Sequence, residues 1–217
     1  MKNKALLLAL ATTVFALSSQ AQTTFGVRAG VNFQNINGED VDGEDLDYKL
    51  KTGINVGVNA EIPVAPDFYV QPGVLFSTKG AKSKVDDDSK IKLSYIEVPI
   101  NFLYKPTLGT GKLLLGIGPY VAFAVGGKVS DANGDDEDIE FENEITLTQF
   151  GSGTPYARRL DVGGNLLFGY EFSNKFSAQL NAQLGMVKIN PEITGPGVDD
   201  DSKVKNTGFG ISLGYRF

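Results

Sequence analysis

TGFGISLGYRF, residues Thr207–Phe217, is the stretch that decides the fold. Large apolar side chains occupy every second position from Phe209 to Phe217, and small or polar residues stand between them. Because successive side chains of a strand point to opposite faces, this alternation predicts a β-strand with a different environment on each face. A strand that ends the chain on an aromatic residue is expected to close a barrel.

The same alternation occurs seven more times upstream and predicts strands at 24–34, 52–62, 68–79, 91–104, 112–128, 159–171 and 175–188. Strands of this length exceed the roughly 5–6 residues usual in soluble sheets and can cross a bilayer at a tilt. The connections alternate between long and short, which is typical of outer-membrane barrels. The sequence therefore predicts an all-β fold, an eight-stranded antiparallel up-and-down transmembrane β-barrel in the bacterial outer membrane. Pro72 removes one ladder donor, so we expect a bulge at that position.

The first 21 residues combine a basic start, an apolar run at 5–17 and small residues before position 22. This pattern predicts a cleaved signal peptide at 1–21 and a barrel domain at 22–217. The alternative is a membrane anchor, but the apolar run is shorter than the roughly 20 residues that a spanning helix needs. Loss of Lys2 and Lys4 would lower the net charge of −6 by two, to −8, which disfavours nucleic acid as a partner.

Cysteine and histidine are both absent from the chain. An exported chain without cysteine has no disulfide framework and depends on strand pairing and packing. The lack of histidine removes the Ser-His-Asp, Cys-His and histidine–metal chemistries. We therefore predict no enzymatic activity and no cofactor.

One face of the predicted strands is apolar, with aromatic residues near the strand ends, and the other is rich in glycine. Aromatic residues at strand ends match the interfacial girdles of membrane barrels. Glycine inside a narrow barrel makes room for long side chains, whereas on a solvent face it only weakens the strand. These features favour an apolar exterior. A soluble lipocalin-like barrel would instead turn the apolar face inward around a ligand.

The polar face carries five charged residues that we expect inside the barrel: Arg28, Glu61, Glu97, Asp161 and Arg216. The two arginines lie on strands that become neighbours when the barrel closes, and the three acids are their expected partners. A mutually satisfied ion network that replaces an apolar core is the favoured interpretation, because an unpaired charge there would be costly. A selective ion or proton path is the alternative.

Two of the predicted external loops are strongly acidic. The loop at 35–50 has a net charge of −5, and the segment 128–158 has a net charge of −6. Within the second, a calcium-loop pattern is matched by Asp131, Asn133, Asp135, Glu137 and Glu142. Asp136 takes the place where that pattern requires glycine, and no flanking helices are expected, so a solvated acidic loop is favoured and no metal site is predicted. Weak binding of divalent cations that bridge lipopolysaccharide or neighbouring molecules stays open.

Three stretches together resemble the PorT-like outer-membrane β-barrel family of Bacteroidota, a family of small porin-like barrels. They are YVQPGVLFSTK at 69–79, LSYIEVPI at 93–100 running on to Tyr104 and Lys105, and GPYV at 118–121. The resemblance implies a small outer-membrane barrel; the founding member is associated with a protein-secretion system. Tyr215 and Phe217 look like the terminal signal that the barrel-assembly machinery reads.

Long loops on a rigid barrel are where binding usually occurs. The sequence therefore predicts a non-enzymatic barrel with a structural or surface-interaction role through its acidic extracellular loops, set in outer-membrane lipid and lipopolysaccharide. A narrow ion or small-solute channel, or a component of a secretion system, is the alternative. A soluble periplasmic ligand-binding barrel is the third possibility.

Overall fold

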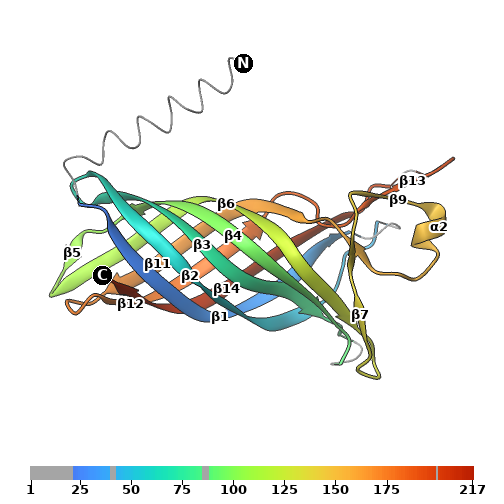
Figure 1. Cartoon of the computed structure of the whole chain (residues 1–217), viewed down its shortest axis with the longest axis horizontal. Helices are drawn as coiled ribbons and strands as arrows, with labels where there is room; N and C mark the ends of the chain where they lie inside the picture. Colours follow the sequence, from blue (N-terminus) through green and yellow to red (C-terminus); the bar gives the residue numbers. More distant parts are fainter. Residues whose placement is uncertain (1–21, 40–42, 85–87, 199) are drawn as a thin grey trace, which may run out of the picture.

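The computed structural model describes residues 22–39, 43–84, 88–198 and 200–217. The predicted signal peptide at 1–21 lies outside the described residues, so its presence and its cleavage stay predictions. Eight long strands form a barrel in the described part (Figure 1). They are β1 (Thr24–Glu39), β2 (Lys49–Ala65), β3 (Phe68–Lys82), β4 (Lys90–Tyr104), β6 (Gly111–Ser130), β11 (Leu160–Glu171), β12 (Phe176–Gly185) and β14 (Lys203–Arg216).

The sheet closes on itself, as the sequence predicts. Its strand order is β11-β12-β14-β1-β2-β3-β4-β6, and β11 also pairs with β6, so each long strand has two neighbours. All these pairings are antiparallel, and β14 completes the wall between β12 and β1. β14 begins at Lys203, four residues before the predicted start, because its first residues also pair with the end of β1. These residues are mostly polar and show no apolar alternation, so the sequence pattern does not indicate them.

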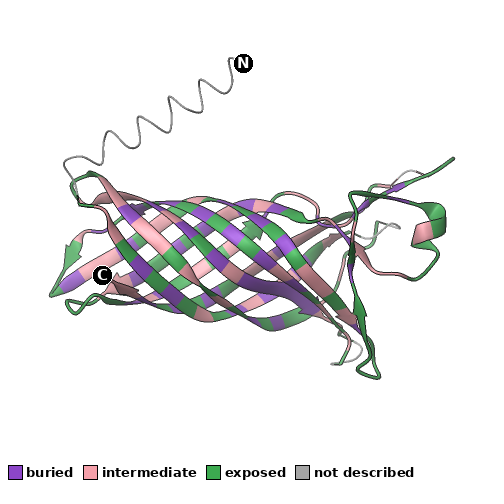
Figure 2. Cartoon of the chain, in the orientation of Figure 1, coloured by how far each residue is buried: buried purple, intermediate pink, exposed green. Residues whose placement is uncertain are grey.

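The two faces of the strands differ in the predicted sense. Buried and exposed residues alternate along the wall (Figure 2). The exposed positions are large and apolar, such as Ile117, Phe168 and Leu213, whereas buried positions carry polar residues such as Asn101, Asp161 and Ser212. An apolar exterior over a polar interior confirms transmembrane strands and excludes the lipocalin-like arrangement for this part of the barrel.

The two ends of the barrel are unequal (Figure 1). The C-terminus lies at the end with short turns, one of which contains β5 (Thr107–Leu108). The long connections gather at the opposite end, which in outer-membrane barrels faces outside. No helix among the described residues is long and apolar enough to cross a membrane.

The segment after β6 is more ordered than a solvated loop, which corrects the prediction for 128–158. It contains β7 (Asp136–Asp138), β8 (Glu140–Phe141), β9 (Glu144–Thr146), the helix α2 (Leu147–Phe150) and β10 (Tyr156–Ala157). β8 pairs with β10, and β9 pairs with β13 (Glu192–Thr194) of the next long connection, both in parallel. Two extracellular connections are thereby joined to each other.

The predicted bulge at Pro72 is wrong. Asn59 faces Gly73 and Ile62 faces Val70 in one continuous register, so the missing amide costs a ladder bond without inserting a residue. The register shifts lie elsewhere, between Leu50 and Asn55 of β2, between Pro63 and Ala65, and between Ser94 and Tyr95 of β4.

Candidate functional site

The centre of the barrel holds a buried ion cluster made by three strands. Lys79 of β3 places its Nζ 3.0 Å from Oδ2 of Asp161 on β11 and 3.1 Å from Oε2 of Glu97 on β4. The side chains of Lys79 and Asp161 have no exposed surface, and that of Glu97 has 3%. Two carboxylates around one ammonium give the cluster a formal charge of −1.

Neutral side chains satisfy the remaining carboxylate oxygens of this cluster. The Tyr120 hydroxyl donates to Asp161 Oδ1 at 3.2 Å, and Asn206 Nδ2 donates to Asp161 Oδ2 at 2.9 Å. Gln183 Nε2 donates to Glu97 Oε1 at 2.6 Å. The Lys79 ammonium also lies 4.1 Å from the centre of the Tyr120 ring, a cation–π distance. Donors on every side make a buried carboxylate tolerable.

Gly163 makes the space that Tyr120 occupies. A Cβ at this position would lie 2.2 Å from the carbonyl oxygen of Leu184 and 2.8 Å from the Tyr120 ring. The glycine of β11 therefore lets a large side chain reach Asp161, as expected for glycine on the inner face of a narrow barrel.

A second ion cluster closes the end of the barrel that has the short turns. Lys105 Nζ lies 2.7 Å from Glu61 Oε2 and 2.8 Å from Glu171 Oε2, and Arg216 Nη2 lies 2.5 Å from Glu61 Oε1. Arg216 Nη1 also donates to Asn59 Oδ1 at 2.7 Å. Two cations and two carboxylates leave this cluster formally neutral.

Amide side chains continue from the second cluster towards the middle of the barrel. Gln71 Nε2 donates to Glu61 at 3.1 Å, Asn101 Nδ2 donates to Gln71 at 3.3 Å, and Asn165 Nδ2 donates to Asn101 at 2.8 Å. These hydrogen bonds form a chain along the inner wall from β2 through β3 and β4 to β11.

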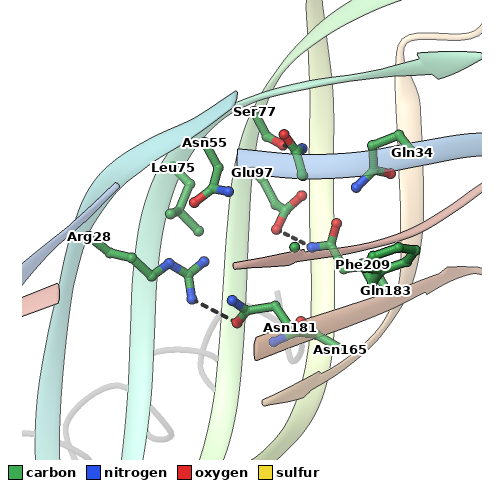
Figure 3. Close-up of a pocket in the computed structure, with 12 residues that line it drawn as sticks. Arg28, Gln34, Asn55, Leu75, Ser77, Glu97, Asn165, Asn181, Gln183 and Phe209 are labelled. Carbon is green, nitrogen blue, oxygen red and sulfur yellow. Dashed lines mark hydrogen bonds between the residues drawn. The ribbon is translucent and has the colours of Figure 1, made fainter. Parts of the chain in front are cut away.

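Arg28 lines the same small cavity as Glu97 of the first cluster (Figure 3). Its Nη1 donates to Asn181 Oδ1 at 3.2 Å, and among the described residues it forms no ion pair with a carboxylate. Cavities of about 30 Å³ and about 10 Å³ adjoin it. Since roughly 10–15 Å³ holds one water molecule, these cavities have room for only a few waters. The lumen is filled rather than open.

The structure places all five predicted lumen residues inside the barrel but pairs only two of them with each other. Arg216 and Glu61 form an ion pair, whereas Asp161 and Glu97 share a lysine, and Arg28 has an amide partner. Lys79 and Lys105, one cation of each cluster, are not among the five predicted residues. Lys79 lies on the polar face of the predicted strand 68–79, so the alternation could have revealed it. Lys105 follows the end of the predicted strand 91–104 and stands beside a proline, so the alternation gives no indication of where its side chain lies.

Tyr215 and Phe217 lie at the end of the barrel with the short turns. Their rings are 5.5 Å apart and edge-on, and the Tyr215 ring lies 4.9 Å from that of Phe176. Phe217 is exposed. The role of these residues as an assembly signal stays a prediction.

The calcium-loop pattern does not form a cation cage in the described part of the chain. Asp131 Oδ1 accepts the backbone amides of Asn133 and Asp135, each at 2.9 Å. The Asp135 amide is the largest of the contacts that hold the pKa of Asp131 below its usual value. Within the described residues no three acidic side chains lie close enough together to hold a metal ion.

A closed eight-stranded wall, an apolar exterior and a lumen filled with ion pairs define a small β-barrel of the bacterial outer membrane. The chain belongs to the family described as outer membrane protein beta-barrel domain, whose model matches residues 19–189. No curated protein matches the chain.

Three solved structures are among those similar to the chain. Neisserial surface protein A is 13% identical, with a TM-score of 0.49, over 90% of this chain and 99% of that chain. Ail, the attachment invasion locus protein of Yersinia pestis, is 18% identical, with a TM-score of 0.42, over the same shares of the two chains. The outer membrane protein AlkL is 13% identical, with a TM-score of 0.36, over 90% of each chain.

Proposed function

We propose that this barrel is a non-enzymatic surface-interaction protein that presents an acidic extracellular surface and does not conduct. The observation that supports this proposal is the order of the long connections at the extracellular end, after β6 and before β14. Because β9 pairs with β13, the connection after β6 and the connection before β14 form one body instead of two separate loops. A rigid body with fixed side chains is better suited to recognition than a freely moving chain, because less entropy is lost on binding.

The charge of this body supports a cationic partner. Asp135, Asp136, Glu137, Asp138 and Glu140 are all exposed in the segment after β6, in or next to β7 and β8. Complementary charge increases association rates and selects partners, and the effect weakens with salt. We also propose that divalent cations bridge the acidic surface to lipopolysaccharide. The barrel-assembly machinery is proposed to insert the chain into the membrane. Membership in the PorT-like group and a role in protein secretion rest on the sequence resemblance alone.

The experiment measures binding of poly-L-lysine to the barrel in nanodiscs of zwitterionic lipid. The test variant neutralises four exposed acids: Asp135→Asn, Glu137→Gln, Asp138→Asn and Glu140→Gln. The matched control exchanges aspartate and glutamate at the same four positions and so keeps the charge. We expect the wild type and the control to bind in a salt-sensitive way and the neutralised variant to bind several-fold more weakly. Equal binding by all three proteins would contradict the proposal.

A further inference from the structure

The extracellular end of the barrel holds a cavity of about 420 Å³ that is partly open to solvent. Its wall is formed by long strands that extend above the membrane-spanning part, with Ile36 from β1, Leu93 from β4 and Val129 from β6. Its cover is formed by the ordered connections, including Ile145 of β9 and Ile193 of β13. It therefore lies inside the barrel wall but outside the polar lumen described above.

Above the membrane-spanning part, the two faces of the strands exchange their polarity: the outer face becomes polar and the inner face apolar. On β4, Ile96 points outward in the spanning part, whereas further along Leu93 is buried and its neighbour Lys92 is exposed. In the cover, Ile139 is buried between the exposed Asp138 and Glu140. Charged side chains thus face solvent, and apolar side chains face the cavity.

Among the residues that the structure describes, no charged side chain lines the cavity, although it lies within the most acidic part of the chain. Of its twenty lining residues, the polar ones other than tyrosine are Thr154, Asn190 and Ser202. Asn190 and Ser202 already hydrogen-bond to each other at 2.7 Å. The described lining therefore offers no counter-ion to a charged ligand and few partners to water.

The floor of the cavity is closed. Tyr95 and Tyr120 belong to the same buried apolar cluster as Leu93, and the Lys79–Asp161 pair contacts these tyrosines from the other side. These buried side chains lie between the cavity lining and the ion cluster of the lumen.

Its size is that of a ligand site rather than a packing defect. Protein interiors are close-packed and contain few voids larger than a water molecule. Pockets for small molecules measure about 300–1,000 Å³, and apolar cavities of about 150 Å³ already stay dry and bind small aromatic molecules. We propose that this cavity binds an uncharged, apolar small molecule that enters from the extracellular side. The proposal goes beyond the surface-interaction role and does not depend on it.

The chain contains no tryptophan, so one introduced indole reports on the site. Tyr156→Trp places it in the cavity wall, in the full chain inserted in nanodiscs. The probe is 1-bromohexane, whose bromine quenches indole fluorescence on contact, and the charged comparison is 6-bromohexanoate. We expect saturable quenching by 1-bromohexane and no saturable quenching by the carboxylate.

Two further variants separate cavity binding from partition into lipid. Phe168→Trp reports from the lipid-facing surface of β11, and its quenching is expected to rise with probe concentration without saturation. Ala157→Leu fills part of the cavity and is expected to weaken saturable quenching of the Tyr156→Trp protein by about tenfold or more. Ile145→Phe provides a second filling variant, and Phe150→Trp a second reporter in the lining, if either first choice lacks the gel shift of a folded barrel.

The possible outcomes either support the proposal or overturn it. Saturable quenching that a filling variant weakens supports it. Non-saturable quenching that matches the lipid-facing reporter, equal quenching by the carboxylate, or indifference to both filling variants would overturn it.

Discussion

Lys79 is the residue on which the central ion cluster depends. It is the only described cation that contacts both Asp161 and Glu97, and its own side chain has no exposed surface. Carboxylates that lose a buried partner must either keep an uncompensated charge or take up protons, and both are costly.

We predict that Lys79→Met lowers the free energy of unfolding by about 3–5 kcal/mol, the usual cost of removing one partner of a buried pair. Urea unfolding in lipid vesicles, followed by the gel shift, measures the change.

Lys84→Met is the control, because Lys84 pairs with Asp47 on the surface, and such pairs contribute at most about 1 kcal/mol. The triple variant Lys79→Met, Glu97→Gln, Asp161→Asn is expected to regain part of the lost free energy of unfolding. Similar losses of stability in Lys79→Met and Lys84→Met would refute the role of the cluster.

Asp200 makes the extracellular cover sensitive to acid. Burial opposes ionisation of its carboxylate, but hydrogen bonds from Ser202 and from the Ile193 amide outweigh it and hold the pKa below its usual value. The Ile193 amide donates to Asp200 Oδ2 at 2.8 Å, and the Ser202 amide donates to Oδ1 at 3.1 Å. A carboxyl whose pKa is depressed by folding stabilises above its unfolded pKa of about 3.9, and the contribution is lost as the pH falls through the folded pKa.

Hydrogen exchange at the Ile193 amide tests this dependence. We expect its protection to be constant between about pH 5 and 7 and to fall below about pH 4. Asp200→Asn should reduce protection across the whole range, whereas Asp201→Asn, at an exposed neighbour, should leave it unchanged. Protection that does not respond to Asp200→Asn would show that the carboxylate does not hold this segment.

At the level of elements, the pairing of the first and last long strands is the feature that makes a barrel from a sheet. Ala29 of β1 faces Leu213 of β14, and β12 pairs with the other edge of β14. Cα atoms of directly facing residues lie about 4.5–5.5 Å apart, within reach of a disulfide, whereas strands two places apart are separated by about twice the strand spacing.

Because the chain contains no cysteine, introduced pairs are unambiguous. Ala29→Cys with Leu213→Cys is expected to form a disulfide under mild oxidation, detected as an altered mobility of the boiled protein. Ala29→Cys with Leu180→Cys places the second thiol on β12 and should not cross-link. The reverse pattern would mean that β14 does not lie between β1 and β12.

The strands could be predicted from sequence because each carries a local signal, the alternation over 11 or more residues. The short elements of the extracellular connections could not be predicted from sequence. β8 and β9 have only two and three residues, and they pair in parallel with distant segments. Such short strands contain no period to read. The start of β14 was misplaced for a related reason, because Lys203 and Lys205 pair with β1 in a region where apolar side chains no longer face outward.

For the ion clusters, too, the sequence predicts which face of a strand a charged residue occupies, but not which residue on another strand it contacts. The position of a charge on the inner face follows from alternation, and the side chains of Glu61, Glu97 and Asp161 are buried. Which cation each acid contacts depends on register and side-chain length across the lumen. Lys105 lies beyond the alternating run of β4, yet its side chain reaches Glu61 on β2 and Glu171 on β11.

The whole molecule combines three layers along the barrel: a neutral ion cluster near the short turns, an acidic ion cluster at the centre, and an apolar cavity under an acidic cover. The two clusters fill the lumen within the membrane-spanning part, and the cavities beside Arg28 hold only a few waters. An eight-stranded barrel interior is about filled by its own side chains, which agrees with this arrangement. The molecule is therefore expected to present a surface and an extracellular cavity rather than a passage across the membrane.

Single-channel recording in planar lipid bilayers tests this closed lumen most directly. The purified barrel, shown to be folded by faster migration before boiling than after it, is inserted and recorded over a range of voltages. We expect no discrete conductance steps, because the two ion clusters would have to open together. Reproducible steps in the wild-type protein that change with Lys79→Met or Arg216→Ala would contradict it and identify the barrel as a narrow channel.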